Sequence, residues 1–191
     1  MEACRLTATE IACRRGERLL FAGVTLDLGS GDALQVAGPN GTGKSSLIRI
    51  LAGLARPFEG SVSREGSAGL LDERPALDEY EPLGRALGFW QRLDSAVAPL
   101  DRLGLGGLAD VPVRYLSTGQ RKRAAIARLI GQDAPIWLLD EPLNGLDREA
   151  VQVVEALVDE HCSAGGIALV ASHQPFALAR MTRLDLTDFI A

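Results

Sequence analysis

The amino-acid sequence predicts an α/β fold with a parallel sheet at its centre. Three observations predict it: a glycine-rich turn between an apolar run and a helical pattern, an apolar run that ends in two carboxylates, and a strand, helix, strand alternation toward the C-terminus. The chain has 191 residues, of which 47% are hydrophobic. This length and composition are sufficient for the core of one compact domain.

The N-terminal part of the chain predicts an antiparallel β layer. Residues 3–13 and 18–28 are typical of two strands around a turn at residues 14–16. Further short strands are predicted over residues 60–63 and 67–71, separated by glycines. We expect both of these strands to extend the same antiparallel layer.

The glycine-rich turn follows a predicted buried strand over residues 33–37. The turn and the residue after it read Gly38, Pro39, Asn40, Gly41, Thr42, Gly43, Lys44, Ser45 and Ser46. A helix is expected next, because Leu47, Ile48, Leu51 and Leu54 recur at helical spacing. Glycines let the backbone bend there and leave N–H groups pointing inward, which together with the helix start form a concave anion site. Lys44 would reach the β- and γ-phosphates of a nucleotide and Ser45 would bind Mg²⁺; the alternative is an empty glycine turn.

Residues 72–131 have a different composition, with prolines at 75, 82, 99 and 112. Helical patterns occur over residues 83–93 and 117–130, with no convincing strand between them. We interpret this region as an inserted helical subdomain.

After this region the sequence predicts a strand over 136–139, a helix over 147–163 and a strand over 167–171. The first of these strands is followed by Asp140 and Glu141, at the edge where open α/β sheets bind their ligands. Asp140 would hold Mg²⁺, and Glu141 would orient or deprotonate an attacking water. Alone, the pair is equally typical of solvated acids at a strand end.

A second candidate anion site lies at the start of the 117–130 helix, formed by Ser117, Thr118, Gly119 and Gln120. A serine at a helix start presents a hydroxyl and free N–H groups at the positive end of the helix dipole. The alternative is an ordinary N-cap in front of a solvated basic face.

Charge and cysteine content exclude several classes of protein. The formal net charge of −5 argues against a broad nucleic-acid-binding surface, so no nucleic acid partner is expected. Cys4, Cys13 and Cys162 are widely spaced and form no CxxC pair, which indicates neither a disulfide framework nor a zinc site. No targeting signal or apolar span is visible, and a reducing cytoplasm fits best.

Taken together, these motifs resemble those of the ATP-binding subunits of ABC transporters along nearly the whole chain. GPNGTGKSSL matches the Walker A loop, LSTGQ the signature, IWLLDEP the Walker B strand, LNGLD the D-loop with Asp147, and Ser172-His173 the switch histidine. The resemblance implies a P-loop NTPase fold with a RecA-like core over 1–71 and 132–191, and the helical subdomain over 72–131. It implies ATP and Mg²⁺ as cofactors and a γ-phosphate contact from His173. It also implies a second copy of the chain, whose ATP site Ser117 and Gly119 complete.

Within that superfamily the chain resembles the ATP-binding subunit of the cytochrome c maturation haem exporter. The length, DEPLNGLD and the run EALVDEHCSAGGIALVASHQPFAL carry this resemblance. It implies integral membrane subunits as partners and a peripheral position on the cytoplasmic face of the bacterial inner membrane. ATP hydrolysis would then drive haem export or the release of a haem-loaded periplasmic chaperone. The helical subdomain would receive a helix of a membrane subunit, with Trp90 as one candidate contact; the alternative is that Trp90 packs in the core.

Two positions depart from the family pattern. The loop that usually carries an adenine-stacking aromatic reads Cys-Arg-Arg-Gly-Glu, so Arg15 is expected to stack on the base or to meet phosphate. At the Q-loop position the usual glutamine is replaced by Arg74, for which we expect slow turnover. Other interpretations are another small ABC exporter, a soluble ABC ATPase acting on DNA or ribosomes, a small-molecule phosphotransferase, and a cassette that binds ATP without hydrolysing it.

Overall fold

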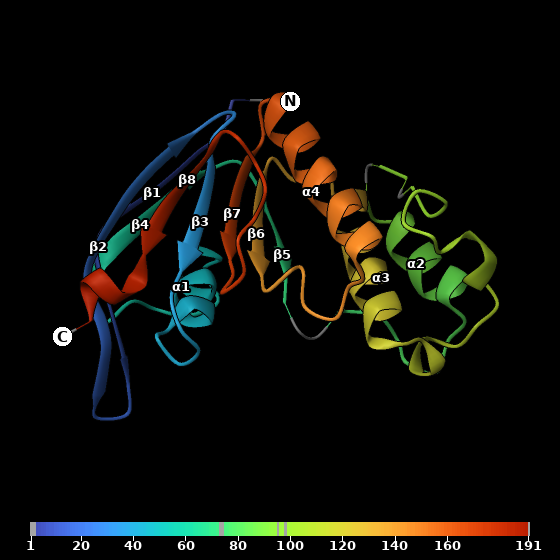
Figure 1. Ribbon diagram of the computed structural model, residues 1–191, viewed down its shortest axis with the longest axis horizontal. Coiled ribbons are helices and arrows are strands. Elements are labelled where there is room, and N and C mark those ends of the chain that lie inside the picture. The colour runs from blue at the N-terminus through green and yellow to red at the C-terminus, as the bar shows by residue number, and fades with distance from the viewer. Residues whose placement is uncertain (1–2, 73–74, 95, 98, 191) are drawn as a thin grey trace.

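Two β-sheets lie side by side in the computed structural model, which describes residues 3–72, 75–94, 96–97 and 99–190 (Figure 1). The antiparallel sheet has the order β2-β1-β4. Its strands are β1 (Arg5–Arg15), β2 (Arg18–Gly29) and β4 (Glu59–Glu65). The second sheet is parallel and has the order β5-β6-β7-β3-β8. Its strands are β3 (Ala33–Ala37), β5 (Ala68–Leu71), β6 (Ile136–Asp140), β7 (Ile167–Ala171) and β8 (Met181–Asp185).

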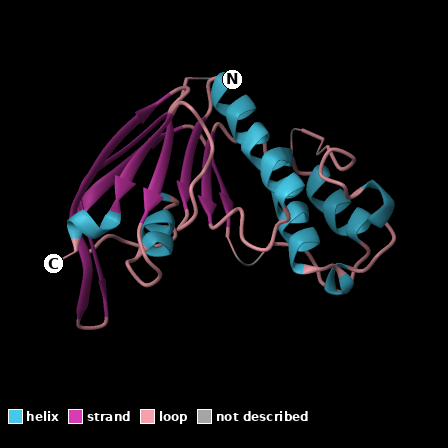
Figure 2. Ribbon diagram, in the orientation of Figure 1, coloured by secondary structure: helices cyan, strands magenta, loops and turns pink. Residues whose placement is uncertain are grey.

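The helices are distributed unevenly about these sheets (Figure 2). They are α1 (Lys44–Leu51), α2 (Leu83–Gln91), α3 (Thr118–Gly131) and α4 (Arg148–Ser163), with single 3₁₀ turns at Gly106–Leu108, Val113–Tyr115 and Leu186–Phe189. In Figure 1, α1 lies on the side of the antiparallel sheet, whereas α2, α3 and α4 lie on the other side of the parallel sheet. The parallel sheet is therefore the middle layer.

Successive side chains along the parallel strands point to opposite faces of the sheet, which creates a core on each face of this middle layer. Leu34, Val36 and Leu138 pack with α1 and the antiparallel sheet. Trp137 and Leu139 point the other way and pack with α3 and α4. Strands buried on both faces read as continuous apolar runs, which is the pattern of β6 and β7.

The expectation for residues 67–71 is wrong in one respect. β4 does join the antiparallel sheet through β1, but β5 pairs in parallel with β6. The turn between them includes Gly66, with φ of 101°, where a Cβ would lie 2.9 Å from Pro135. The chain thus passes from one sheet to the other within a few residues.

Two further features differ from the sequence-based expectation. The helix after the glycine-rich turn ends at Leu51, so Leu54 lies outside it and is 67% exposed. β8 was not predicted; it forms an edge of the parallel sheet beside β3.

The region 72–131 contains α2 and α3 as expected, and its division from the rest of the chain stays a prediction. Trp90 packs in this region: its Nε1 donates to the carbonyl of Ala76 at 2.6 Å, and the guanidinium of Arg128 lies 4.1 Å from its ring centre. Tyr80 and Phe89 are exposed.

Among the residues described, no helix combines the length and apolar character needed to cross a bilayer.

Candidate functional site: a phosphate-binding turn at the strand ends

The glycine-rich turn leads from the carboxyl end of β3 into α1. Gly43 is the N-cap and has a left-handed backbone with φ of 107°. A Cβ at this position would lie 2.9 Å from the ring of Phe21 in β2, so glycine allows the turn to pack against the antiparallel sheet. The helix has no side-chain cap and no acidic residue in its first turn. Its N-terminal amides and the positive end of its dipole can therefore interact with an anion.

Lys44 is the first residue of α1 and its side chain folds back over the turn. The ammonium donates to the carbonyls of Gly38 at 2.8 Å and Pro39 at 3.2 Å, and the side chain is only 6% exposed. Thr42 closes the same turn by donating its hydroxyl to Pro39 at 2.9 Å. A buried ammonium requires acceptor oxygens, and phosphate oxygens would serve as well as these carbonyls.

Glu141 lies between Lys44 and His173. Its Oε1 is 3.5 Å from Lys44 Nζ, and its Oε2 is 2.9 Å from His173 Nδ1. Its backbone N–H donates to Ala171 at the end of β7, at 2.8 Å, and its φ of 47° is in the left-handed region that non-glycine residues rarely adopt. β3, β6 and β7 run in the same direction, so their carboxyl ends lie at one edge of the sheet (Figure 1). Three of the sequence-predicted residues thus come together at this edge.

The oxygen ligands available for a metal ion are few. Asp140 ends β6 and is buried, whereas Ser45 lies exposed in the first turn of α1. Among the described residues there is no group of three or more His, Cys, Asp or Glu side chains that could hold an ion. This donor set fits Mg²⁺, which typically takes one or two carboxylates and completes its shell with phosphate oxygens and water.

A cleft of about 720 Å³ surrounds the turn. It is lined by Arg15, Gly16, Arg18, Leu20, Asn40, Gly41, Gly43, Lys44, Ser45, Ser46, Glu141 and Asn144. Arg15, whose contact with nucleotide stays a prediction, is among them. Arg18, Leu20 and Asn144 were not predicted to line the site. For Arg18 a signal was available, because the two-residue turn of the β1–β2 hairpin puts it opposite Arg15.

The start of α3 lies outside this cleft: of the signature residues 117–120, none is among the described residues that line it. Ser117 and Gln120 form a capping box, in which Ser117 Oγ accepts from the Gln120 amide at 3.2 Å and Gln120 Oε1 accepts from the Ser117 amide at 2.8 Å. Ser117 and Thr118 are exposed. One chain therefore does not bring its signature to its own phosphate-binding turn.

The D-loop packs against the signature of the same chain. A Cβ on Gly119 would lie 2.7 Å from the carbonyl oxygen of Gly145, and one on Gly145 would lie 3.1 Å from Thr118. Asp147 follows as the N-cap of α4, where its Oδ1 accepts from the amide of Ala150 at 2.8 Å. The two glycines allow this close approach of the two segments.

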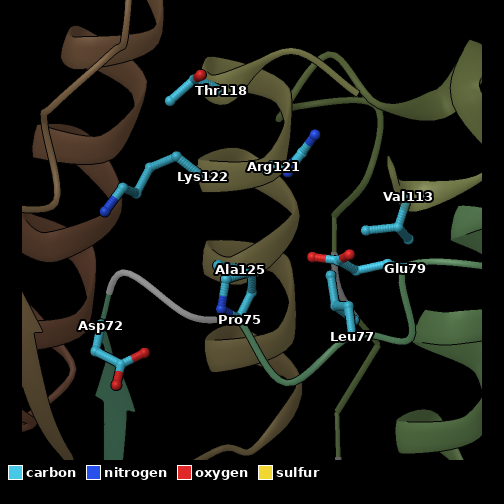
Figure 3. A pocket seen from close by; sticks show the side chains of 9 residues that line it. All are labelled: Asp72, Pro75, Leu77, Glu79, Val113, Thr118, Arg121, Lys122 and Ala125. Carbon is cyan, nitrogen blue, oxygen red and sulfur yellow. The ribbon is translucent and has the colours of Figure 1, made fainter. Parts of the chain in front are cut away.

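A second cleft, of about 390 Å³, lies between the end of β5 and α3 (Figure 3). Its lining comprises Asp72, Pro75, Leu77, Glu79, Val113, Thr118, Arg121, Lys122 and Ala125. Arg121 is held in place by donating to the carbonyls of Leu116 at 3.0 Å and Arg114 at 2.8 Å. The predicted Q-loop residue Arg74 lies outside the described residues.

Two buried polar residues support the sheet, a role that was not predicted from the sequence. Gln35 in β3 donates through Nε2 to the carbonyl of Gln174 at 2.7 Å, which ties down the segment after His173. His161 in α4 stacks on Trp137 with ring centres 3.9 Å apart, and its Nε2 lies 3.2 Å from the carbonyls of both Pro135 and Ile167. Burial lowers the pKa of His161, which favours the neutral ring.

Comparison with known proteins gives a consistent result. The family model described as ABC transporter matches residues 21–144. The cytochrome c biogenesis ATP-binding export protein CcmA of Novosphingobium aromaticivorans is 56% identical over 189 residues, which cover 99% of each chain. The protein of the same name from Haemophilus influenzae is 38% identical over 213 residues, which cover 100% of this chain and 99% of that one.

Solved structures show the same fold. An ATP-binding subunit of an ABC transporter superposes with a TM-score of 0.81 at 22% identity, covering 95% of this chain and 86% of the other. RNase-L Inhibitor superposes with a TM-score of 0.76 at 28% identity, covering 88% of this chain but only 34% of that one. The ABC ATPase fold predicted from the sequence is thereby confirmed.

Proposed function

Since this chain belongs to the ABC transporter family, we propose that it is the ATP-hydrolysing subunit of a membrane complex for cytochrome c biogenesis. The observation that carries the proposal is the placement of Glu141 between Lys44 and His173 beside an uncapped helix start. This arrangement suits hydrolysis of a phosphoanhydride. Its full-length relatives are named for cytochrome c biogenesis and export, which supplies the biological process.

Different residues of the chain bind the phosphates, activate the water and hold the metal ion. The turn amides and Lys44 bind the β- and γ-phosphates, which lowers the cost of the charge on the transferred group. Glu141 orients and deprotonates the attacking water. His173 fixes the direction of the Glu141 carboxylate through its contact with Oε2, and it would also contact the γ-phosphate. Mg²⁺, held by Ser45 and Asp140, would neutralise charge on the phosphate oxygens.

A second copy of the chain completes each ATP site. Ser117 and Gly119 begin α3 at the surface, away from the cleft of their own chain, and a helix start is an anion site. We place this helix start of one copy over the γ-phosphate held by the other, in a head-to-tail pair. Gly119 lies close to Gly145 of the D-loop, so the D-loop, which ends at Asp147, lies beside the helix start that would cover the phosphate.

The second cleft is the docking position for a membrane subunit. It combines apolar side chains with the charged groups of Glu79 and Arg121, and it lies between the end of β5 and the signature helix. We expect this cleft to receive a helix of the membrane subunit. The chain then works as a peripheral protein on the cytoplasmic face of the bacterial inner membrane, and ATP hydrolysis drives haem export or release of the haem-loaded chaperone.

Two measurements test this proposal. In a strain that lacks the chain, the unaltered protein should restore cytochrome c maturation, and Glu141→Gln should not, although it still associates with membranes. Removing a general base lowers turnover by about 10²–10⁴-fold, which is enough to abolish the process. Affinity purification of Glu141→Gln should recover multi-span membrane proteins. Recovery of ribosomes, or full maturation by Glu141→Gln, would contradict the proposal.

A further inference from the structure

Two arginines face each other at the tip of the β1–β2 hairpin. Arg15 and Arg18 are directly opposed in the strand pairing and are joined by Gly16, with φ of 58°, and Glu17. Residues in direct opposition project from the same face of a hairpin, and like charges placed there destabilise it. Both side chains are exposed, and neither guanidinium forms a hydrogen bond or ion pair with any residue that the structure describes. A ligand rich in hydrogen-bond acceptors would be stabilised by both charges.

The arginine pair lines the same cleft as the phosphate-binding turn. Lys44 and the start of α1 hold the phosphates at one end, so the hairpin tip is the wall left for the base. None of the described residues that line the cleft is aromatic. Arg14, the neighbour of Arg15, does not line it and instead stacks on Phe58, with its guanidinium carbon 4.5 Å from the ring centre.

Guanidinium groups distinguish between the two purines. Arginine offers only N–H donors, in a planar fork. Guanine presents two acceptors side by side, O6 and N7, which a guanidinium can engage with two hydrogen bonds. Adenine presents N7 next to an amino group, and this amino group is itself a donor. Stacking of the guanidinium plane is available to both bases and favours neither.

We propose that Arg15 and Arg18 form a base subsite that accepts guanine, so that the chain binds MgGTP at least as tightly as MgATP. The inference rests on the proposed function, because it concerns the base end of the same nucleotide site. It extends the substrate class from ATP to purine nucleoside triphosphates.

The test measures dissociation constants of MgATP and MgGTP for the full chain by calorimetry, in the Glu141→Gln background so that neither nucleotide is consumed. We expect MgGTP to bind at least as tightly as MgATP. The double variant Arg15→Ala/Arg18→Ala should weaken MgGTP about fivefold more than MgATP, the low end for a bidentate arginine–guanine contact because both side chains are exposed. Both side chains are exposed at the hairpin tip, so the variant should fold.

Arg14→Ala is the control, since it removes one positive charge from the same hairpin outside the cleft, whereas the double variant removes two charges inside it. It should leave the ratio of the two constants unchanged. MgGTP binding about tenfold weaker than MgATP in the parent chain would overturn the inference. Equal weakening of both nucleotides in the double variant would also overturn it, because the arginines would then contact phosphate. Binding of neither nucleotide would contradict the proposed function as well, whereas tight MgATP binding alone would leave that function intact.

Discussion

His161 makes the stability of the fold depend on pH. Burial against Trp137 lowers the pKa of this imidazole, so the folded chain binds its proton less readily than the unfolded chain. The unfolded state therefore takes up more protons as the pH falls below about 6.5, the ordinary histidine value. The stabilisation is complete above that pH and is lost as the pH falls toward the lower folded value.

We expect the free energy of unfolding of the isolated chain to fall between pH 7.5 and pH 5.5 through this group. Urea denaturation at both pH values measures it. His161→Gln keeps a polar group near the carbonyls of Pro135 and Ile167 but loses the stacking on Trp137, so it should be less stable at pH 7.5. Because glutamine does not titrate, this variant should lose less stability on acidification. An equal loss in both proteins would show that other groups carry the effect.

At the scale of single elements, Ser117 has two separable roles. As the N-cap of α3 it accepts from the Gln120 amide, a contact that typically contributes about 1 kcal/mol. In the proposed pair, the same side chain faces a phosphate of the other copy. Ser117→Asp preserves the cap, because aspartate is an equally good N-cap, but it places a negative charge beside that phosphate.

Ser117→Asp should therefore retain stability in urea denaturation and lose ATP turnover in the assembled complex, measured as phosphate release. Ser117→Ala should lose about 1 kcal/mol of stability and a smaller part of the turnover, because it removes the hydroxyl without adding a charge that repels the phosphate. Normal turnover in Ser117→Asp would argue that the start of α3 stays away from the nucleotide.

Two helical glycines provide a matched comparison of packing. A Cβ on Gly119 would lie 2.7 Å from a backbone carbonyl in the D-loop, whereas a Cβ on Gly88 in α2 would meet nothing within 4 Å. Gly119→Ala should lower the free energy of unfolding by about 1 kcal/mol or more, because backbone must shift. Gly88→Ala should raise it by about 0.5–1 kcal/mol by restricting the unfolded chain. Both are read by urea denaturation, and equal effects would contradict the contact.

The element-scale predictions from sequence succeeded where a pattern is local and failed where pairing is long-range. β6, α4 and β7 were placed correctly because apolar runs and helical spacing identify them. β5 was assigned to the wrong sheet, since its own residues do not say whether its neighbour is β4 or β6. β8 has little buried surface and carries Thr182 and Arg183, as suits a polar edge strand that shows no alternation.

For the whole molecule, the proposed head-to-tail pair predicts that two inactive variants can complement each other. Lys44→Ala disables the turn of its own chain and leaves its signature intact, whereas Ser117→Arg does the reverse. A mixed pair has one site in which both parts are intact. We expect each variant alone to be inactive in the assembled complex and a mixture to regain turnover, measured as phosphate release. No recovery on mixing, with both variants shown to be folded, would contradict the head-to-tail pair.

The residues of the candidate site that follow parallel strands could be predicted from the sequence, whereas those that reach it from other elements could not. Lys44, Glu141 and His173 each follow a parallel strand, so topology alone brings them to one edge. Arg18 reaches the cleft through a hairpin from the other sheet, and the pattern of the parallel strands contains no information about that sheet's position. The relation between two copies of the chain is likewise absent from one copy's strand order.

The contact between Lys44 and Glu141 has a consequence for the protein between catalytic cycles. The ammonium lies 3.5 Å from Oε1 and the imidazole 2.9 Å from Oε2, so both oxygens of the proposed general base have a partner. If Lys44 binds a triphosphate as proposed, the phosphate oxygens compete with Oε1 for the same ammonium. We therefore expect nucleotide binding itself to release the carboxylate oxygen that acts on the attacking water.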